Sequence, residues 1–459
     1  MPVLGGGPRL LFPNATGLSW IPGRRILFSE TLTGMHMALS TAADNHSLTR
    51  HIYVPRHERG MAHFSQLSPD GKWVLVVEMD HNGDWLPCRV VPFDGRSEGR
   101  LAGPNGACTA AAWSPDGGWM YFSVAVGGAF HIWRQRWPAA GPEQITFGPT
   151  DEKGIAVAPD GHSLVTSIGM LQSTIWVHDM GGNREVSSDG FATSPAFSRD
   201  GRMLYWLREE SAAAAEAELW AFNFSSGTSG PALPSVAMQS YNISADGKQV
   251  AFSVKNDSGI SEIWLTPLDR LASPKRLISS HTDTPFFGSP GELIFRSVEK
   301  GASFIEKIKL TGEDRKRVLP SSIIFLYSVS PSGFWASARI PITGEPTSVA
   351  AAAVPLKGGP VVPICAGTGW VKWAPDGKFL YISEVSGSPP NRRTLALPIS
   401  DGQELPDLPP GGIRSFEDGM ALPGARIINE PDVAPGLNPF TYAYAKADVH
   451  RNLFRIPLP

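Results

Sequence analysis

The chain has 459 residues, 42% of them hydrophobic, which is enough to bury a large core. Its formal net charge is −3 and its lysines and arginines form no long block, so nucleic acid and anionic membranes are poor candidate partners. No apolar stretch approaches the ~20 residues of a membrane-spanning helix, and the N-terminus lacks the basic start and apolar core of a secretory signal. As written, the chain is expected to stay where it is made. A location outside the cytoplasm would require a preceding membrane segment.

The cysteines are few and widely separated, at Cys88, Cys108 and Cys365. Their number is odd and no two have C-x-x-C spacing, so we expect neither a disulfide framework nor a zinc site. No cofactor is expected either.

The first residues resemble the middle of a repeat unit. Residues 2–12 (PVLGGGPRLLF) are similar to residues 354–362 (VPLKGGPVV), which join the third and fourth predicted strands of a later unit. The chain is therefore expected to start in mid-unit. A degenerate turn and strand follow at residues 22–28.

From there a turn glycine recurs eight times, at intervals of 40 to 46 residues. In six units an aspartate precedes the glycine, whereas the units at Gly291 and Gly333 keep only the glycine. A tight hairpin turn needs glycine for positive φ and aspartate to bond the local backbone, so we assign these residues a structural role. The pairs are Asp70-Gly71, Asp116-Gly117, Asp160-Gly161, Asp200-Gly201, Asp246-Gly247 and Asp376-Gly377, and the lone glycines are Gly291 and Gly333.

Each unit predicts four short strands. Apolar runs follow the turns at residues 73–77, 120–122, 164–165, 204–206, 250–252 and 379–382. A strand precedes the turn, as at 109–113 and 371–373. A third strand carries Trp133, Trp176, Trp220 or Trp264, which should fill space between sheets, and a looser fourth strand, such as 276–278, leads onward.

Two later segments depart from this pattern. Residues 211–218 are strongly helical in composition but too short to stand alone, so we interpret them as a loop excursion. Residues 434–444 repeat the turn and strand in degenerate form, and residues 452–459 end where a third strand ends. The N-terminal strand could supply the missing fourth strand and close a ring. Alternatively, the chain is a piece of a longer array.

A period near 44 residues with four strands per unit predicts an all-β fold, a β-propeller of four-stranded antiparallel blades. About ten units run continuously through residues 1–459. Single rings usually have about four to eight blades. Three arrangements therefore remain open: one unusually large ring, two rings, or one complete ring with remnants of another.

The Ser-Pro-Asp-Gly-Lys turn at residues 68–72, its counterparts and the downstream Ile-Trp pairs resemble the WD40-like, TolB-type propellers over nearly the whole length. Residues 56–63, 73–80 and 451–459 resemble, more narrowly, the propeller region of acidobacterial-type receptor serine/threonine kinases. That resemblance implies a kinase domain ahead of a sensory or binding propeller. This chain has no Gly-rich phosphate loop, H-R-D or D-F-G motif, so kinase activity is not implied.

Two short sequences match catalytic motifs but lack the secondary structure that these motifs require. Gly95-Arg-Ser97-Glu-Gly99 matches the G-x-S-x-G elbow, but a loop sequence surrounds it where a strand and a helix are needed. Ser297-Val-Glu-Lys300 matches S-x-x-K, but on a strand this spacing puts the two side chains on opposite faces. We expect neither serine to be catalytic.

Residues of the types that bind metal ions are also better explained by a role in turns or in the fold. Asp80 to Asp84 resembles the start of a calcium loop, but Trp85 and Val91 stand where glycine and glutamate are needed, which favours a turn at Asn82-Gly83. Four histidines cluster in sequence without the spacing of a metal site: His51, His57, His63 and His81. The turn aspartates recur in most units, so they serve the fold and not a cation site.

These observations predict a non-enzymatic propeller that binds a protein, peptide or small ligand through loops at one face of its ring. The alternative is a sensory or substrate-gating region of a kinase or peptidase whose catalytic domain is missing from this chain. The sequence assigns no catalytic, binding or metal residues, and it leaves the oligomeric state open.

Overall fold

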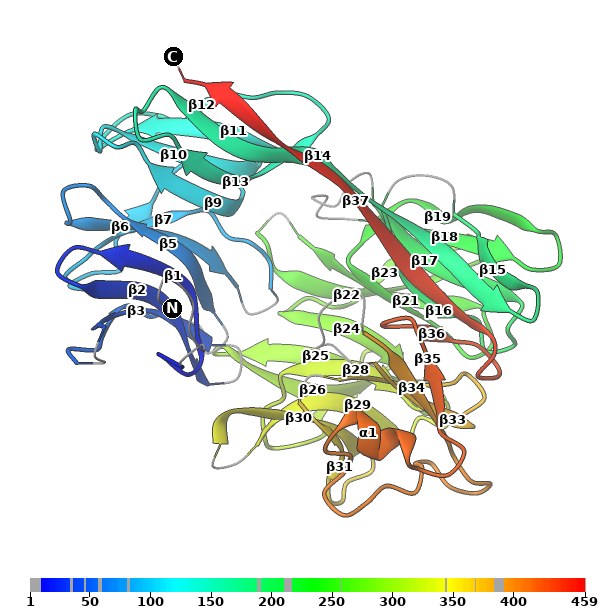
Figure 1. Ribbon diagram of the computed structural model, residues 1–459. Helices are drawn as coiled ribbons and strands as arrows, with labels where there is room; N and C mark the ends of the chain where they lie inside the picture. The colour runs from blue at the N-terminus through cyan, green and yellow to red at the C-terminus, as the bar shows by residue number, and fades with distance from the viewer. Residues whose placement is uncertain are drawn as a thin grey trace. The chain divides into compact units, whose positions relative to one another are not determined.

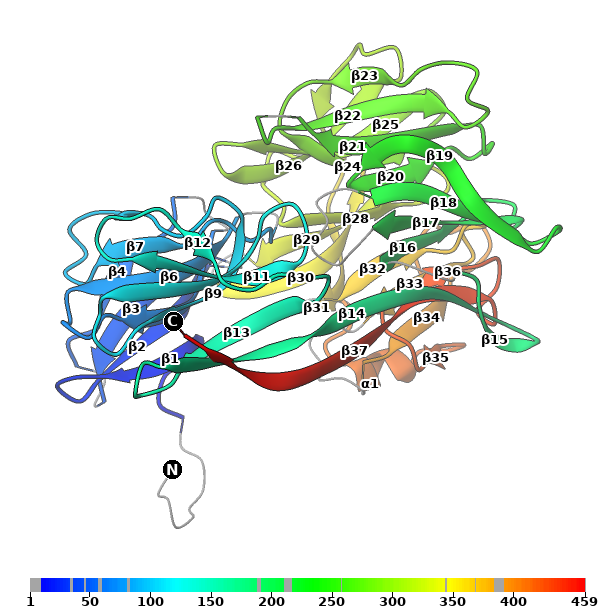
Figure 2. The same ribbon diagram turned by 90° about the horizontal axis from the view of Figure 1, so that it is seen from above.

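A computed structural model describes residues 10–33, 36–44, 47–56, 60–80, 83–187, 191–209, 217–256, 258–342, 345–367, 369–383 and 392–458. The chain divides into two compact units, which we call the arc (Met1–Met170 with Val449–Pro459) and the ring (Leu171–Asp448). Each unit is a series of small antiparallel sheets, or blades (Figures 1 and 2). The expected all-β propeller architecture is confirmed.

The ring has six blades. Five of them consist of consecutive strands: β16 (Phe191–Phe197), β17 (Met203–Glu209), β18 (Ala217–Asn223) and β19 (Thr228–Met238); β20 (Ser240–Ile243), β21 (Gln249–Lys255), β22 (Ser261–Pro267) and β23 (Lys275–Ile278); β24 (Thr282–Phe287), β25 (Glu292–Glu299), β26 (Ala302–Lys309) and β27 (Lys316–Arg317); β28 (Phe325–Val329), β29 (Trp335–Ile342), β30 (Glu345–Pro355) and β31 (Val362–Ala366); β32 (Trp370–Trp373), β33 (Phe379–Ser383), β34 (Thr394–Pro398) and β35 (Arg426–Ile428).

The sixth blade joins the two ends of the ring. Its strand order is β36 (Ala434–Pro435), the first part of β37 (Tyr442–Pro457), the last part of β14 (Ser163–Asp179) and β15 (Gly182–Glu185). Two strands thus come from each end of the ring segment. This pairing joins the first and last strands of the ring segment in one sheet and so closes the ring.

Apolar side chains fill the space between all neighbouring blades of the ring. Phe252 packs between the first and second blades, Tyr442 between the fifth and sixth, and Ala443 between the sixth and first. Because the described residues form a core at each of the six junctions, the ring is closed. As expected, Trp220 and Trp264 on third strands pack against these cores.

The arc has four blades. Its strands are β1 (Ala15–Ile21), β2 (Arg25–Thr33), β3 (His36–Ala43) and β4 (Arg50–Tyr53); β5 (Met61–Leu67), β6 (Trp73–Met79), β7 (Arg89–Pro92) and β8 (Arg100–Leu101); β9 (Ala107–Trp113), β10 (Trp119–Ala125), β11 (Phe130–Arg136) and β12 (Glu143–Gln144); and β13 (Asp151–Val157) with the first part of β14 and the last part of β37.

Apolar cores fill the three junctions between successive blades of the arc. No core joins the fourth blade to the first among the described residues. Leu11 and Phe12 instead cover the outer flank of the first blade, where the Phe12 and Phe28 rings stack at 4.8 Å. Of the arrangements left open by the sequence, the structure has one complete ring and one partial set of blades.

The end-to-end pairing corrects two sequence expectations. Residues 164–165 and Trp176 were expected on separate strands of one hairpin, but both belong to the continuous strand β14. The intervening sequence holds Gly169 but no turn dipeptide, and the interval from Gly161 to Gly201 is the shortest in the series. This unit is therefore shared between the arc and the ring.

The two ends of the chain differ from expectation in detail. Residues 452–457 take the third position of a sheet, as expected. They pair with β14 in the arc, and they continue the strand that starts at Tyr442. The proposed N-terminal closing strand lies largely outside the described residues. So does most of the helical segment 211–218, of which Ala217 and Glu218 begin β18.

One helix is present among the described residues, α1 (Phe416–Met420), between β34 and β35. Ser415 caps its N-terminus, and its hydroxyl accepts from the Asp418 N–H. No described helix has the length and apolar character needed to cross a membrane.

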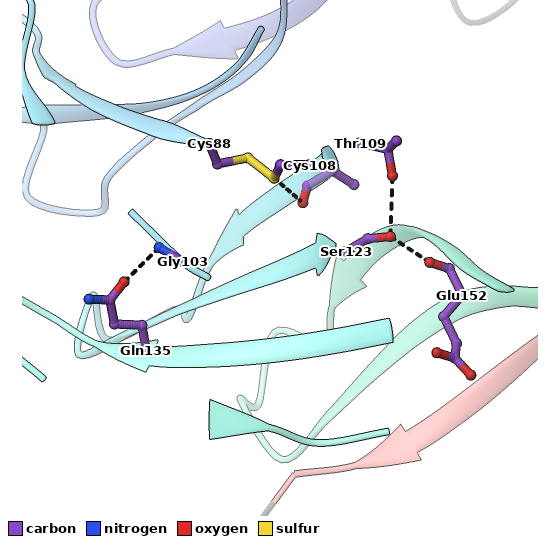
Figure 3. Close-up of a disulfide and its surroundings, with 8 residues drawn as sticks. Cys88, Gly103, Cys108, Thr109, Ser123, Gln135 and Glu152 are labelled. Carbon is purple, nitrogen blue, oxygen red and sulfur yellow. Dashed lines mark hydrogen bonds between the residues drawn. A yellow bond between two sulfur atoms is a disulfide. The ribbon is translucent and has the colours of Figure 1, made fainter. Parts of the chain in front are cut away.

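A disulfide joins Cys88 and Cys108 in the arc (Figure 3), so the expectation of unpaired cysteines was wrong for this pair. Cys88 precedes β7 in the second blade and Cys108 lies on β9 in the third, with Cα atoms 5.5 Å apart. Both are fully buried in the core between these blades. Cysteine number and spacing did not reveal the pair because the blade packing, not a local motif, brings the two together.

We expect Gly169→Ala to destabilise the fold. A Cβ at Gly169 would lie 2.0 Å from the carbonyl oxygen of His450 on β37, so β14 and β37 would have to separate. Overpacking of this kind costs about 1–3 kcal/mol, which urea unfolding would measure. The matched control is Gly230→Ala in β19, where nothing lies within 4 Å, and a similar loss in both variants would contradict the account.

Loss of the disulfide should also lower stability. The bond closes a loop with a sequence separation of 20, for which chain entropy gives about 3 kcal/mol. We expect reduction of the wild type to lower the free energy of unfolding by this order, and Cys88→Ala with Cys108→Ala to lower it by at least as much. Equal unfolding midpoints for the oxidised and reduced wild type would show that the bond contributes nothing.

Candidate functional site

The turn residues that the sequence singles out lie in the hairpins between the first and second strands of the blades. All six paired glycines have φ between 70° and 77°, a conformation that favours glycine. In the same turns the aspartate Oδ1 accepts a hydrogen bond from the backbone N–H two residues later, at 3.0–3.1 Å. These carboxylates are engaged locally, within the turn.

Four turns also contain a serine whose hydroxyl donates to the aspartate: Ser68, Ser114, Ser198 and Ser244. This hydrogen bond is the main reason why the pKa of Asp70, Asp116, Asp200 and Asp246 lies below the usual value. The same serine oxygens accept the N–H that starts the next strand.

The ring contains a central pocket with a volume of about 370 Å³. Its wall is built by the innermost strand of every blade, β16, β20, β24, β28, β32 and β36, and by the turns that follow these strands. The volume lies in the range of small-ligand sites, about 300–1,000 Å³. Ring closure brings together residues that are remote in sequence.

Aromatic side chains form much of the pocket wall. Trp370 and Tyr327, from neighbouring blades, stack with ring centroids 5.5 Å apart, and Trp370 is 39% exposed. The Tyr327 hydroxyl accepts a hydrogen bond from Arg339 Nε at 2.6 Å. Burial raises the pKa of Tyr241, which stays protonated and donates to the Ser194 carbonyl oxygen at 2.8 Å. An accessible aromatic stack can receive a ring or apolar group of a ligand.

Two of the ten non-glycine residues with positive φ in the described chain line the pocket. Ser194 has φ 54° and Asp432 has φ 46°. Aspartate tolerates this region, whereas serine before Pro195 is doubly disfavoured. At Ser194 this conformation belongs to a β-bulge that recurs in other first strands, at Gly17, Gly154 and Thr284, so it serves the blade and does not by itself mark a ligand site.

Two cations and one carboxylate line the pocket. Lys372 Nζ and Asp432 Oδ1 form an ion pair at 2.5 Å. Arg199 donates from Nη1 to the carbonyl oxygen of Pro331, at 3.2 Å. None of these three residues was predicted from the sequence as a site residue, although Arg199 stands out because it replaces the proline of the Ser-Pro-Asp-Gly turn.

The serines of the two catalytic strings lie elsewhere. Ser97 is exposed in the loop between β7 and β8, where its hydroxyl accepts from the Gly99 N–H at 3.3 Å. Ser297 is buried on β25 and donates to Glu306 Oε1 at 2.7 Å, while Lys300 follows in the turn.

The candidate metal ligands are not brought into a cluster. His51 Nδ1 lies 2.9 Å from Ser40 Oγ, and His63 packs against Trp85, where burial lowers its pKa. His57, His81 and Asn82 lie outside the described residues. Within the described part of the chain, no three His, Cys, Asp or Glu side chains gather as metal ligands.

No protein-family model matches the chain, and no curated protein matches it. Solved propeller structures are similar at low identity. A TolB protein of Agrobacterium tumefaciens is 17% identical with a TM-score of 0.43, and the match covers 61% of this chain and 99% of that one. TolB of Acinetobacter baumannii is 13% identical with a TM-score of 0.39, covering 74% and 76%. The tricorn protease is 11% identical with a TM-score of 0.37, covering 90% and 43%.

At these sequence identities and TM-scores, the fold assignment rests on the strand order and blade packing of this chain. The functions of the similar proteins are not transferred to it. The narrower resemblance to kinase propellers stays a prediction.

The lowered pKa of the turn carboxylates predicts a pH dependence. A carboxylate with a depressed folded pKa adds stability above the unfolded value, ~3.9, and this stability is lost as the pH falls through the folded value. We expect Ser114→Ala to reduce the loss of stability between about pH 7 and pH 3 relative to wild type, because the Asp116 pKa returns toward its usual value. Urea unfolding at both pH values measures this difference.

The control for that experiment is Ser97→Ala, which removes an exposed hydroxyl that bonds only its own loop. An identical pH dependence in wild type and Ser114→Ala would contradict the assigned role of the serine.

Proposed function

We propose that this chain is a non-enzymatic binding module whose ring receives a segment of a peptide or protein in its central pocket. The observation that carries the proposal is the pocket itself, about 370 Å³ in volume and walled by all six inner strands. Its stacked Trp370 and Tyr327 offer apolar surface, and the polar residues Asn242 and Arg199 line the same pocket. Apolar walls with a few placed polar groups are typical of ligand sites.

One further observation bears on the kind of ligand. The net charge of −3 over 459 residues does not favour nucleic acid as the ligand.

The polar groups of the pocket favour binding over catalysis. No histidine or cysteine occurs among the described residues that line it. Its carboxylate, Asp432, is paired with Lys372. A general base would need a nucleophile or substrate proton within hydrogen-bond reach and a pKa matched to the working pH.

The test is binding of short random peptides, displayed as an array, to the purified full chain, followed by affinity measurements on those that bind. We expect Trp370→Ala to weaken binding by at least about tenfold, because a central tryptophan is often a hot spot. Circular dichroism would verify that the variant keeps its fold.

The matched control is Trp20→Ala, which removes a tryptophan that is 70% exposed on β1 of the arc, outside the pocket. Binding that is unaffected by Trp370→Ala would overturn the proposal. So would hydrolase, kinase or phosphatase turnover by the purified chain that one point substitution abolishes.

A further inference from the structure

Arg199 breaks the repeat at a position where its side chain reaches the ring axis. Five other turns have proline there, namely Pro69, Pro115, Pro159, Pro331 and Pro375, and the turn of the next blade has Ala245. The fold of this turn therefore does not require arginine. Its neighbours Ser198 and Asp200 keep the same hydrogen bonds as in the other units.

The Arg199 side chain crosses to the far side of the pocket. Its Nη1 donates to the carbonyl oxygen of Pro331, 132 residues away. Arg199 follows β16 in the first blade and Pro331 follows β28 in the fourth, and these blades are opposite each other in a ring of six. The guanidinium group thus spans the end of the pocket where the turns lie, while Trp370 stands at the start of its inner strand, toward the other end.

The charge of Arg199 is not compensated. It makes no ion pair with any described residue, and the Pro331 carbonyl takes only one of its several N–H donors. The other cation of the pocket, Lys372, is neutralised by Asp432 at 2.5 Å. The pocket therefore holds one unpaired positive charge, at the end crossed by the guanidinium.

We infer that Arg199 receives a carboxylate of the ligand at this end of the pocket. The inference rests on the proposed function and deepens it. A guanidinium presents parallel N–H donors that match a carboxylate in two-point geometry, which an ammonium group cannot do. The ligand enters past Trp370 and Tyr327, packs its apolar part against them and directs its carboxylate toward Arg199.

The carboxylate can come from the C-terminus of a peptide or from an aspartate or glutamate side chain. A peptide array separates the two sources if every sequence is present with a free and with an amidated C-terminus. If the C-terminus is the source, amidation abolishes binding. If a side chain is the source, binding survives amidation and is lost when aspartate or glutamate is replaced by its amide.

The decisive variant is Arg199→Pro, which gives this turn the Pro-Asp-Gly sequence of four other units and removes the cation. We expect it to weaken the binding of carboxylate peptides by about tenfold to a hundredfold, as for a lost charge-assisted hydrogen bond. Arg199→Lys should restore binding only in part, and Arg199→Gln provides a second neutral variant if the proline variant does not fold.

The matched control is Arg202→Gln, which removes a charge from the same turn but from a side chain outside the pocket wall. It should bind like wild type. The relevant peptides are those that lose affinity in Trp370→Ala. If wild type and Arg199→Pro bind these peptides with equal affinity, the inference is wrong and the proposed function stands. No peptide binding by wild type would overturn both.

Discussion

The structure depends on one constraint: a blade is a thin antiparallel sheet with two apolar faces, and each face must be covered. In the ring, six blades meet at six buried cores, and the closing blade draws strands from both ends of residues 171–448. The pairing of β37 with β14 is what completes this cycle. In the arc, three cores join four blades, and Leu11 and Phe12 cover the first flank. The buried Cys88–Cys108 bond adds a covalent link between two of its blades.

Ring closure also creates the candidate site. Once the sixth blade is in place, the innermost strands face a common axis, so Ser194, Tyr327 and Asp432 line one pocket although they are far apart in sequence. Most turns of the repeat have proline where Arg199 stands, and departures from the rules of a fold are expected at functional sites.

The repeating elements could be predicted from sequence because their physics is local. An aspartate and a glycine set each hairpin turn, and the apolar run after the turn sets a buried strand, so the turns at Asp70 and Asp376 and the strands that follow them were found at their places. Ten units were expected, and the ring and arc contain six and four blades. What the sequence could not provide were long-range choices: the continuity of β14, its pairing with β37 and the disulfide depend on packing between distant segments. The pocket was missed for the same reason, although Arg199 in place of a turn proline was a local sign of it.

The central claim is that a closed six-bladed ring binds its ligand on the axis. The most direct measurement is an experimental structure of the full chain with a peptide that it binds. The account predicts peptide density inside the ring, between the Trp370–Tyr327 stack and Arg199, with β36, β37, β14 and β15 in one sheet. Density confined to the outer edges of the blades, with an unoccupied axis, would contradict it.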